Sequence, residues 1–241
     1  MSGRLGNLEL NTFTIAARDP RTGMIGICTS TRVPAVGAIT TYASAGAGAV
    51  VTQARANPLF GVDGLELLRR GYDAEEAIGR LLDGDPEPER RQLLVVPAEG
   101  ALSAYTGSGT EEWRGHRIGD DYVAAGNLLV GEETVAAMER SFLDSAGEPL
   151  NERLVAALEA GQAAGGDSRG KQSAALYVVR HEPYPCVDLR VDDHPEPVAE
   201  LRRLYELVKT DLLPLVEALP TREEPETALG EDIRGDLIPE E

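Results

Sequence analysis

The first clear pattern of apolar and polar residues along the chain is a pair of strands. Residues 12–17 and 24–29 are rich in β-branched and apolar side chains, and residues 19–23 between them contain a proline and a glycine. Proline fixes φ and glycine permits a positive φ, so the middle segment favours a turn. The pattern therefore predicts a β-hairpin over residues 12–29.

Apolar runs predict the remaining strands and helical spacings predict the helices, and strands and helices follow one another in groups along the chain. Strand patterns end at residues 52–53 and cover residues 91–97, 101–105, 123–127, 174–180 and 186–191. Helical spacing covers residues 64–70, 73–83, 131–146, 149–161 and 197–213. This order of grouped strands and helices favours helical layers against β-sheet over an alternating Rossmann pattern.

The two ends of the chain differ from residues 12–219, which we expect to form one domain. Residues 1–11 show little pattern and are expected to form an N-terminal arm. Residues 220–241 are acidic and contain three prolines, so we expect a disordered tail that buries too little apolar area to offset its ordering entropy. Spaced aliphatic residues leave open a short docking segment instead. They are Leu229, Ile233, Leu237 and Ile238.

The composition of the 241 residues narrows the function classes. A hydrophobic fraction of 42% is enough for a globular core. No apolar run approaches the roughly 20 residues that cross a membrane, and the N-terminus lacks the pattern of a signal peptide, so we expect a cytoplasmic protein. The net charge of −18 argues against nucleic acid and membranes as partners.

Cysteines and histidines are too few or too scattered to predict a metal site. Cys28 and Cys186 can form one disulfide at most, and Cys28 lies in an apolar strand, which favours a packed thiol over a nucleophile. His116, His181 and His194 have no metal-ligand spacing. No phosphate-binding glycine loop is present and no Gly-x-Ser-x-Gly elbow marks a catalytic triad, although a triad stays open. We expect no cofactor.

Hydroxyl and cationic side chains gather at the open end of the predicted hairpin. The hairpin places Thr12 near Thr29, Ser30 and Arg32. A threonine hydroxyl is a poor nucleophile unless a base accepts its proton. The α-amino group, with a pKa of about 8, can be that base when the threonine begins the chain. A catalytic Thr12 would therefore require cleavage after Asn11.

A second polar cluster lies in the predicted loop of residues 165–173. Asp167, Arg169 and Lys171 follow one another closely there and can bind a carboxylate or orient a nucleophile. We predict that this loop lines the same cleft as Thr12. The alternative is that Asp167 and Arg169 pair within the loop or across a subunit contact.

Eight segments together resemble a known family. They are residues 12–15 (TFTI), 35–37 (AVG), 45–58 with AGAGAV, TQ and NP, 126–131 (GNLLVG), 161–175 (GQAAGGDSRGKQSAA) and 188–195 (DLRVDDHP). By these segments, which span about residues 12–204, the chain resembles the domain-of-unknown-function 1028 family, placed in the N-terminal-nucleophile (Ntn) hydrolase superfamily.

The resemblance implies an α+β fold, a four-layer αββα sandwich with two antiparallel sheets between helical layers. It also implies a site whose nucleophile is the first residue of the first strand, the place of Thr12. Ser30 and Arg32 fall where related hydrolases keep polar and basic support. The matching segments contain the candidate substrate-binding residues Gln53, Asn57, Asn127, Asp167, Arg169 and Lys171.

The chain departs from many of these relatives in two ways. Relatives often begin at a Met-Thr boundary, whereas eleven residues precede Thr12 here. Relatives also often have a cysteine in the loop after residues 105–107, and this chain has none there.

Two functions remain as hypotheses. The first is an amidohydrolase that attacks an amide of a small molecule or peptide through Thr12, with Ser30 and Arg32 tuning the nucleophile and backbone N–H groups stabilising the oxyanion. The alternative is a non-catalytic protein that binds a small ligand on the same sandwich. In either case we expect a homo-oligomer, a dimer or higher.

Overall fold

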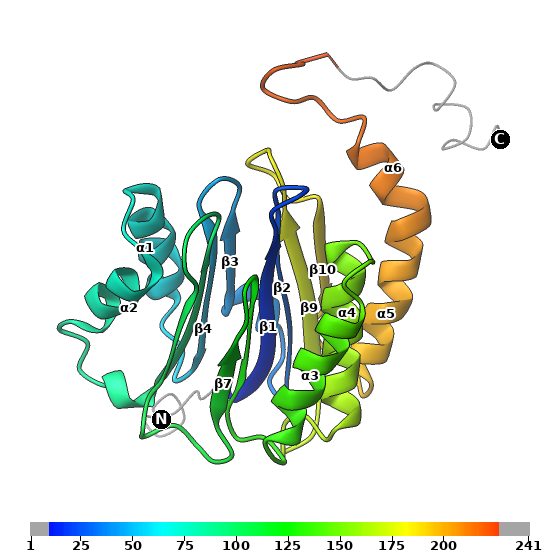
Figure 1. Cartoon of the computed structure of the whole chain (residues 1–241). Helices are drawn as coiled ribbons and strands as arrows, with labels where there is room; N and C mark the ends of the chain where they lie inside the picture. Colours follow the sequence, from blue (N-terminus) through cyan, green and yellow to red (C-terminus); the bar gives the residue numbers. More distant parts are fainter. Residues whose placement is uncertain (1–9, 227–241) are drawn as a thin grey trace, which may run out of the picture.

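The predicted hairpin is present at the centre of the larger sheet. The computed structural model describes residues 10–226, and in it β1 (Thr12–Asp19) and β2 (Met24–Thr31) pair antiparallel, with Thr12 opposite Thr31 and Asp19 opposite Met24. Gly23 has a φ of 69°, a value that glycine adopts readily, and its N–H donates to the Asp19 carbonyl to close the turn. In Figure 1 the start of β1 is at the lower end and the turn at the upper end.

Four more strands extend this hairpin into an antiparallel sheet in the order β10-β9-β2-β1-β8-β7. They are β7 (Gly115–Ile118), β8 (Tyr122–Gly126), β9 (Ser173–Val179) and β10 (Val187–Val191). The sequence predicts all of them except β7. This edge strand reads Gly-His-Arg-Ile and is only half-buried, so its residues give almost no hydrophobic signal.

The smaller sheet is also antiparallel and has the order β3-β4-β5-β6. Its strands are β3 (Thr41–Ser44), β4 (Gly48–Ala54), β5 (Arg91–Pro97) and β6 (Ser103–Thr106). The predicted buried strands at residues 91–97 and before residues 52–53 are both confirmed. The two sheets face each other, and an apolar cluster with residues from both lies between them.

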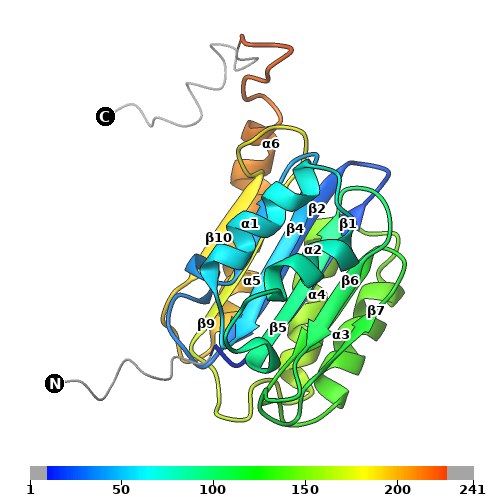
Figure 2. The same ribbon diagram turned by 90° about the vertical axis from the view of Figure 1, so that its left-hand side faces the viewer.

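Helices cover the outer face of each sheet (Figures 1 and 2). The smaller sheet packs against α1 (Pro58–Arg69) and α2 (Ala74–Leu82). The larger sheet packs against α3 (Glu133–Asp144), α4 (Leu150–Ala163) and α5 (Pro197–Leu207). The predicted arrangement of two antiparallel sheets with outer helices is thereby confirmed in its general form.

The start of α1 corrects the sequence prediction of a short helix over residues 64–70. The helix begins at Pro58, because the Asn57 side chain accepts a hydrogen bond from the Leu59 N–H at 3.1 Å and caps it. Two glycines obscured the helical pattern. A side chain at Gly61 would overlap the Tyr42 ring, so this glycine permits close packing of α1 on β3.

The predicted C-terminal helix over residues 197–213 is present but interrupted. After α5 the chain makes one π-helical segment (Val208–Leu212) and continues as α6 (Leu213–Val216). Residues 220–226 contain no helix or strand. The aliphatic residues of the predicted docking segment and the arm before residue 10 lie outside the described residues. None of the helices within residues 10–226 combines the length and apolarity needed to span a bilayer.

Both cysteines are buried and free. Cys28 belongs to the apolar cluster between the larger sheet and its helices, where burial raises the pKa of its thiol far above the usual range. A thiol of this kind stays protonated and packs as a small apolar group. The prediction of a packed Cys28 is confirmed.

Candidate active site at the start of the first strand

The side chains between the two sheets change from apolar to polar toward the start of β1. Every second residue of a strand points to the same face. Toward the hairpin turn these residues are apolar: Ala16, Ile25, Ile27, Ala49, Val51, Leu94, Val96, Val123, Ala125 and Val179. Toward the start of β1 they are polar and fully buried: Thr12, Thr14, Thr29, Thr31, Gln53, Gln92 and Asn127. We call these sets the apolar half and the polar half of the sheet interface.

Thr12 is the first residue of the polar half, and its backbone and hydroxyl are both engaged. The hydroxyl donates a hydrogen bond to the Leu10 carbonyl at 2.6 Å. The Thr12 carbonyl accepts from the Asn127 N–H at 3.1 Å and from Gln53 Nε2 at 3.5 Å. With residues 10 and 11 attached, Thr12 has no exposed surface.

The carbonyl of Asn11, which forms the peptide bond to Thr12, accepts two hydrogen bonds. Thr31 Oγ1 donates to it at 2.5 Å, and Arg169 Nη2 donates to it at 3.0 Å. A guanidinium and a hydroxyl on one carbonyl oxygen draw electron density toward that oxygen and stabilise negative charge there. The peptide bond next to the Thr12 hydroxyl is therefore polarised in the manner of an oxyanion site.

Asp167 holds Arg169 in place from within the loop of residues 165–173. Its carboxylate accepts from Arg169 Nε at 3.0 Å and Nη2 at 2.7 Å, and from the Arg32 N–H at 3.1 Å. The Asp167 side chain is 1% exposed, so its carboxylate is shielded from water, while the Arg169 side chain is 33% exposed. The loop thus carries a cation to the residue before Thr12. Lys171 instead pairs with Glu196.

A chain of neutral hydrogen bonds crosses the polar half between the sheets. Thr14 Oγ1 lies 2.7 Å from Thr29 Oγ1 and donates to Gln53 Oε1 at 2.7 Å. Gln53 Nε2 donates to Gln92 Oε1 at 2.7 Å, and Asn127 Nδ2 donates to the same oxygen at 2.8 Å. Buried polar groups need such partners, because each one left unpaired costs roughly 1–3 kcal/mol.

Gln92 sets the orientation of the Asn127 amide. Its Nε2 lies within 2.9 to 3.1 Å of Thr106 Oγ1, the Gly126 carbonyl and the Gly115 carbonyl, so this end of Gln92 donates and its Oε1 accepts. Asn127 must then present its NH₂ group to Gln92 and its oxygen elsewhere. Among the described residues 10–226, Asn127 Oδ1 is a buried acceptor without a hydrogen-bond partner. The backbone N–H of the same residue donates to the Thr12 carbonyl.

The backbone is strained next to two of these residues. Ala54 follows Gln53 with a φ of 63°, and Leu128 follows Asn127 with a φ of 51°. Positive φ is costly for residues with a Cβ, and such strain gathers at functional sites. Ala54 also pairs with the arm: Leu10 N–H donates to the Ala54 carbonyl at 2.6 Å, and Ala54 N–H donates to the Leu10 carbonyl at 3.0 Å.

Besides Lys171, three more of the predicted site residues are not brought to Thr12 by the structure. Ser30 lies on the opposite face of β2, where its hydroxyl donates to the Ser173 carbonyl at 3.0 Å. Arg32 is exposed, and its guanidinium donates to Gln172 at 2.8 Å. Asn57 caps α1. Because faces alternate along a strand and Thr12 pairs with Thr31, the hydroxyl beside Thr12 comes from Thr31 and not from Ser30.

Thr31 and Gln92 are absent from the residues singled out in the sequence. Strand alternation could have indicated Thr31 once the hairpin register was known. Gln92 stands next to Arg91 at the start of strand β5, ahead of five apolar residues, and all seven residues of the strand are buried. A buried amide in such a strand is a signal of a hydrogen-bond network.

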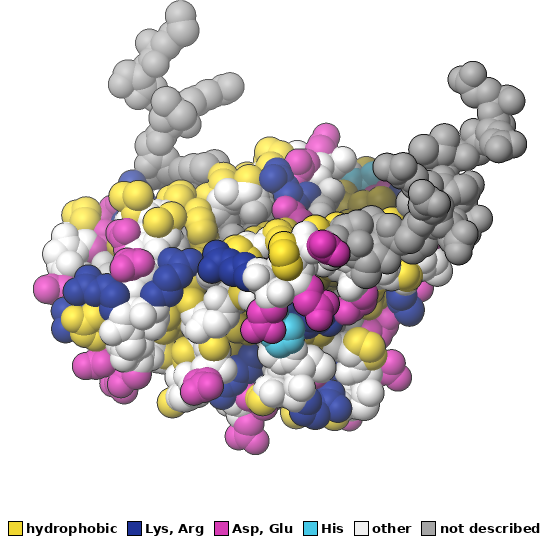
Figure 3. All heavy atoms as spheres, turned by 90° about the horizontal axis from the view of Figure 1, so that it is seen from above, with side chains coloured by type: hydrophobic (Ala, Val, Ile, Leu, Met, Phe, Trp, Pro, Cys, Tyr) yellow, Lys and Arg dark blue, Asp and Glu magenta, His cyan; other side chains and the backbone are white. Residues whose placement is uncertain are grey.

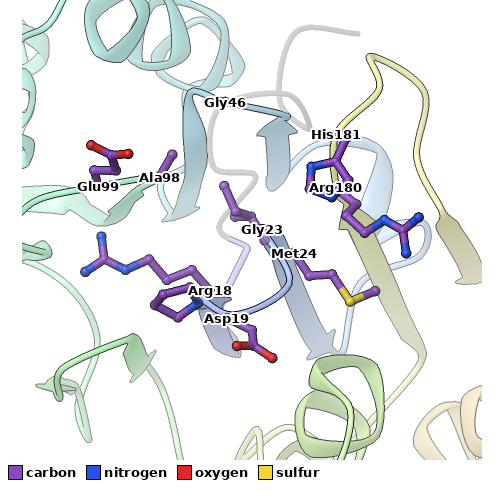
Figure 4. A pocket seen from close by; sticks show the side chains of 11 residues that line it. Arg18, Asp19, Gly23, Met24, Gly46, Ala98, Glu99, Arg180 and His181 are labelled. Atoms are coloured by element: carbon purple, nitrogen blue, oxygen red, sulfur yellow. The ribbon is translucent and has the colours of Figure 1, made fainter. Parts of the chain in front are cut away.

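A cavity of about 350 Å³ lies at the other end of the hairpin, beside its turn (Figure 4). Its charged walls are largely paired: Arg18 with Asp121, Asp19 with Arg21 and Arg180 with Glu217. Figure 3 views the molecule from this end and shows basic, acidic and apolar side chains mixed over the surface. This cavity offers no nucleophile held against a polarised carbonyl.

No group of three or more His, Cys, Asp and Glu side chains within residues 10–226 is arranged to hold a metal ion. The side chains nearest Thr12 are hydroxyls, amides and one guanidinium. Their chemistry is nucleophilic attack, hydrogen bonding and stabilisation of negative charge on oxygen.

Comparison with known proteins places this geometry in a family. The family model described as "Family of unknown function (DUF1028)" matches residues 12–201. The crystal structure of protein SPO2555 from Silicibacter pomeroyi, which carries the same family model, is similar, with a TM-score of 0.83 and 30% sequence identity. That match covers 91% of this chain and 100% of the other. Among curated proteins, none matches the chain. Since the family model covers most of the sequence and begins at Thr12, the chain belongs to the DUF1028 family.

Proposed function

We propose that the protein is an amidohydrolase of the N-terminal-nucleophile type, in which Thr12 attacks the carbonyl carbon of an amide. The observation that carries the proposal is the Asn11 carbonyl, held by Thr31 and Arg169 next to the Thr12 hydroxyl. The order of helices, sheet, sheet and helices, with Thr12 first on a central strand, supports the four-layer αββα sandwich of Ntn hydrolases.

The same geometry supports release of the arm by the protein itself. Thr12 Oγ1 forms a bond to the Asn11 carbonyl carbon, and the developing oxyanion is stabilised by Arg169 and Thr31. The Asn11–Thr12 C–N bond then breaks, and the proton of the hydroxyl is transferred to the Thr12 nitrogen. Water hydrolyses the resulting ester, which leaves a carboxylate on Asn11 and restores the Thr12 hydroxyl. Every atom and proton in this sequence comes from the chain or from one water.

Cleavage supplies the base that a threonine nucleophile lacks. The new α-amino group of Thr12 has an ordinary pKa of about 8 and accepts the hydroxyl proton during later turnovers. Asn127 Oδ1 is the buried acceptor available to hold this amine, since the Asn127 backbone already bonds to Thr12 at 3.1 Å. The unpaired oxygen thereby acquires a partner that the uncut chain does not provide.

Turnover of a substrate repeats the same chemistry on a second carbonyl. The Thr12 hydroxyl attacks the substrate amide, the α-amino group takes its proton, and Arg169 and Thr31 stabilise the oxyanion. The amine of the substrate leaves with that proton, and water hydrolyses the ester on Thr12. Arg32 contributes indirectly, because its backbone N–H fixes the carboxylate of Asp167 that orients Arg169.

The alternative is a small-ligand-binding protein that performs no chemistry. The observation that favours it is that Thr12 has no exposed surface while Leu10 and Asn11 precede it. If these residues were never removed, Thr12 would have neither a free amine nor access to a substrate.

Intact-mass analysis of the purified protein separates the two functions. We expect the wild-type chain to lose residues 1–11 on incubation and Thr12→Ser to lose them too, because a hydroxyl is kept. Thr12→Ala should retain the arm and lose at least about 1000-fold in amidase activity, since the nucleophile is gone. Thr22→Ala is the matched control, a hydroxyl loss in the hairpin turn that keeps Thr12 and the polar half.

The outcome that contradicts the proposal is a folded wild-type protein whose mass stays that of the full chain. Equal arm loss in the wild type and Thr12→Ala would mean that a contaminating protease trims the chain. The first result would favour the ligand-binding alternative, and the second would exclude release of the arm by Thr12 itself.

A further inference from the structure

We infer that Leu10 and Asn11 occupy the site that binds the acyl half of the substrate. The substrate is then a peptide-like amide: Thr12 attacks the carbonyl of one residue, and the residue before that one has an aliphatic side chain. This inference rests on the proposed function and adds the class of substrate to it. It depends on three features of the arm: its covalent relation to Thr12, its backbone pairing with Ala54, and the burial of the Leu10 side chain.

The covalent relation makes the arm an analogue of a bound acyl group. Attack of Thr12 Oγ1 on the Asn11 carbonyl gives an ester that joins the Leu10-Asn11 segment to Thr12. Attack on a substrate amide gives an ester on the same oxygen atom. Both acyl carbonyls must also use the same oxyanion donors, Thr31 and Arg169. The group attached to the acyl carbon therefore leads into the same space in both cases.

That space is built for an extended peptide backbone. Leu10 donates to and accepts from Ala54 at the end of β4, at 2.6 and 3.0 Å. An added strand of this kind is recognised through main-chain hydrogen bonds, with side chains read in adjacent positions. Ala54 holds the required geometry at a strained φ of 63°, which indicates that this pairing position is maintained by the surrounding structure. An acyl group without a peptide N–H and C=O cannot make the two bonds.

The side-chain positions of the arm set a preference. Leu10 is 1% exposed and is among the largest fully buried side chains of the molecule. Asn11 is 4% exposed, so the position at the reacting carbonyl is also enclosed. A charged group in the place of Leu10 would lose its hydration without gaining an ion pair, which disfavours acidic or basic residues there.

The test uses protein that was produced as the full chain and has released residues 1–11. Its hydrolysis of three peptide amides of aminomethylcoumarin is measured. They are acetyl-Leu-Asn, acetyl-Glu-Asn, and acetyl-Leu-Asn methylated on the leucine nitrogen. We expect kcat/KM for acetyl-Leu-Asn to exceed that for each of the others at least about 10-fold. The N-methyl probe removes the hydrogen bond to the Ala54 carbonyl without changing the protein, so folding of a variant does not enter the comparison.

A β-lactone that acylates threonine, followed by mass analysis, shows independently whether Thr12 is an active nucleophile. Arm release and Thr12 acylation with the expected preference support the inference. Arm release and Thr12 acylation with equal rates for the three amides overturn the inference and leave the proposed function standing. A chain that keeps its arm and is not acylated overturns both.

Discussion

The apolar and polar halves of the sheet interface lie on the same strands and are equally buried, yet different forces hold them. Toward the hairpin turn, residues such as Ile27 and Val96 pack as a dry apolar cluster. Toward the start of β1, Thr12, Gln53 and Gln92 are fully buried without contributing much apolar area. The first half is stabilised by removing surface from water, and the second by hydrogen bonds that replace those made to water.

This difference indicates where chemistry is located in the molecule. An apolar half alone would hold two sheets together at lower cost, because buried amides and hydroxyls stabilise only when every partner is present. The polar half is therefore explained better by function than by stability. The charges that line the cavity beside the hairpin turn are largely paired, so the presence of a cavity does not identify the reactive residues here.

The largest effect on stability is expected in the apolar half. Ile27→Ala removes a fully buried side chain and should lower the free energy of unfolding by about 2–5 kcal/mol, measured by urea denaturation. Val62→Ala on α1 is the matched surface control, because Val62 is 56% exposed, and it should change stability by less than about 0.5 kcal/mol. Similar losses in both variants would show that the apolar half is not the main source of stability.

A smaller effect on stability, together with a loss of activity, is expected in the polar half. Gln92→Leu leaves Gln53 and Asn127 without their shared acceptor and should cost about 1–3 kcal/mol. Without that acceptor the Asn127 amide is free to turn, so activity after arm release should fall as well. Gln92→Glu keeps an acceptor for both amides but loses the donor to the Gly115 and Gly126 carbonyls, so it tests the other end of the same side chain. Equal activity in Gln92→Leu and the wild type would exclude Gln92 as a positioning residue.

The smallest effect is expected on the pH dependence of the free energy of unfolding, and it should come from residues outside the polar half. The network of Thr14, Gln53, Gln92 and Asn127 contains no ionisable side chain; only at its edge does Thr106 bond to His116, whose pKa is lowered by burial. Beside Gln92, hydrogen bonds from Arg91 lower the pKa of Asp85 below its ordinary value of 3.8.

The sign of that response follows from the lowered pKa. The folded state holds the Asp85 proton less tightly than the unfolded state, so the pair contributes its full stability above about pH 3.8 and loses it as the pH falls through the folded pKa. The difference in unfolding free energy between the wild type and Asp85→Asn should therefore be constant from pH 7 to pH 5 and shrink below pH 3.8. A constant difference down to pH 3 would exclude this contribution of Asp85.

The sequence by itself determined the local elements and two of the chemical features. Turn residues between two β-branched runs specify the hairpin, and Asp73 caps α2, whose start agrees with the helical spacing over residues 73–83. The position of Thr12 at the start of a strand, and of Asp167 and Arg169 in one polar loop, could be found because these features depend on neighbours in the chain. Weakly patterned elements such as β7, and the glycine-containing start of α1, could not.

Only the tertiary structure decided which of these residues meet. The register of the hairpin places Thr31 rather than Ser30 beside Thr12, because one residue along a strand reverses the face. Gln53, Gln92 and Asn127 come from different strands, and their contact depends on how the two sheets face each other. Arg169 reaches the Asn11 carbonyl across 158 positions of sequence. Local sequence patterns do not predict such contacts, because the contacts form only when the two sheets pack together. The buried amides and hydroxyls find their hydrogen-bond partners only in the folded chain.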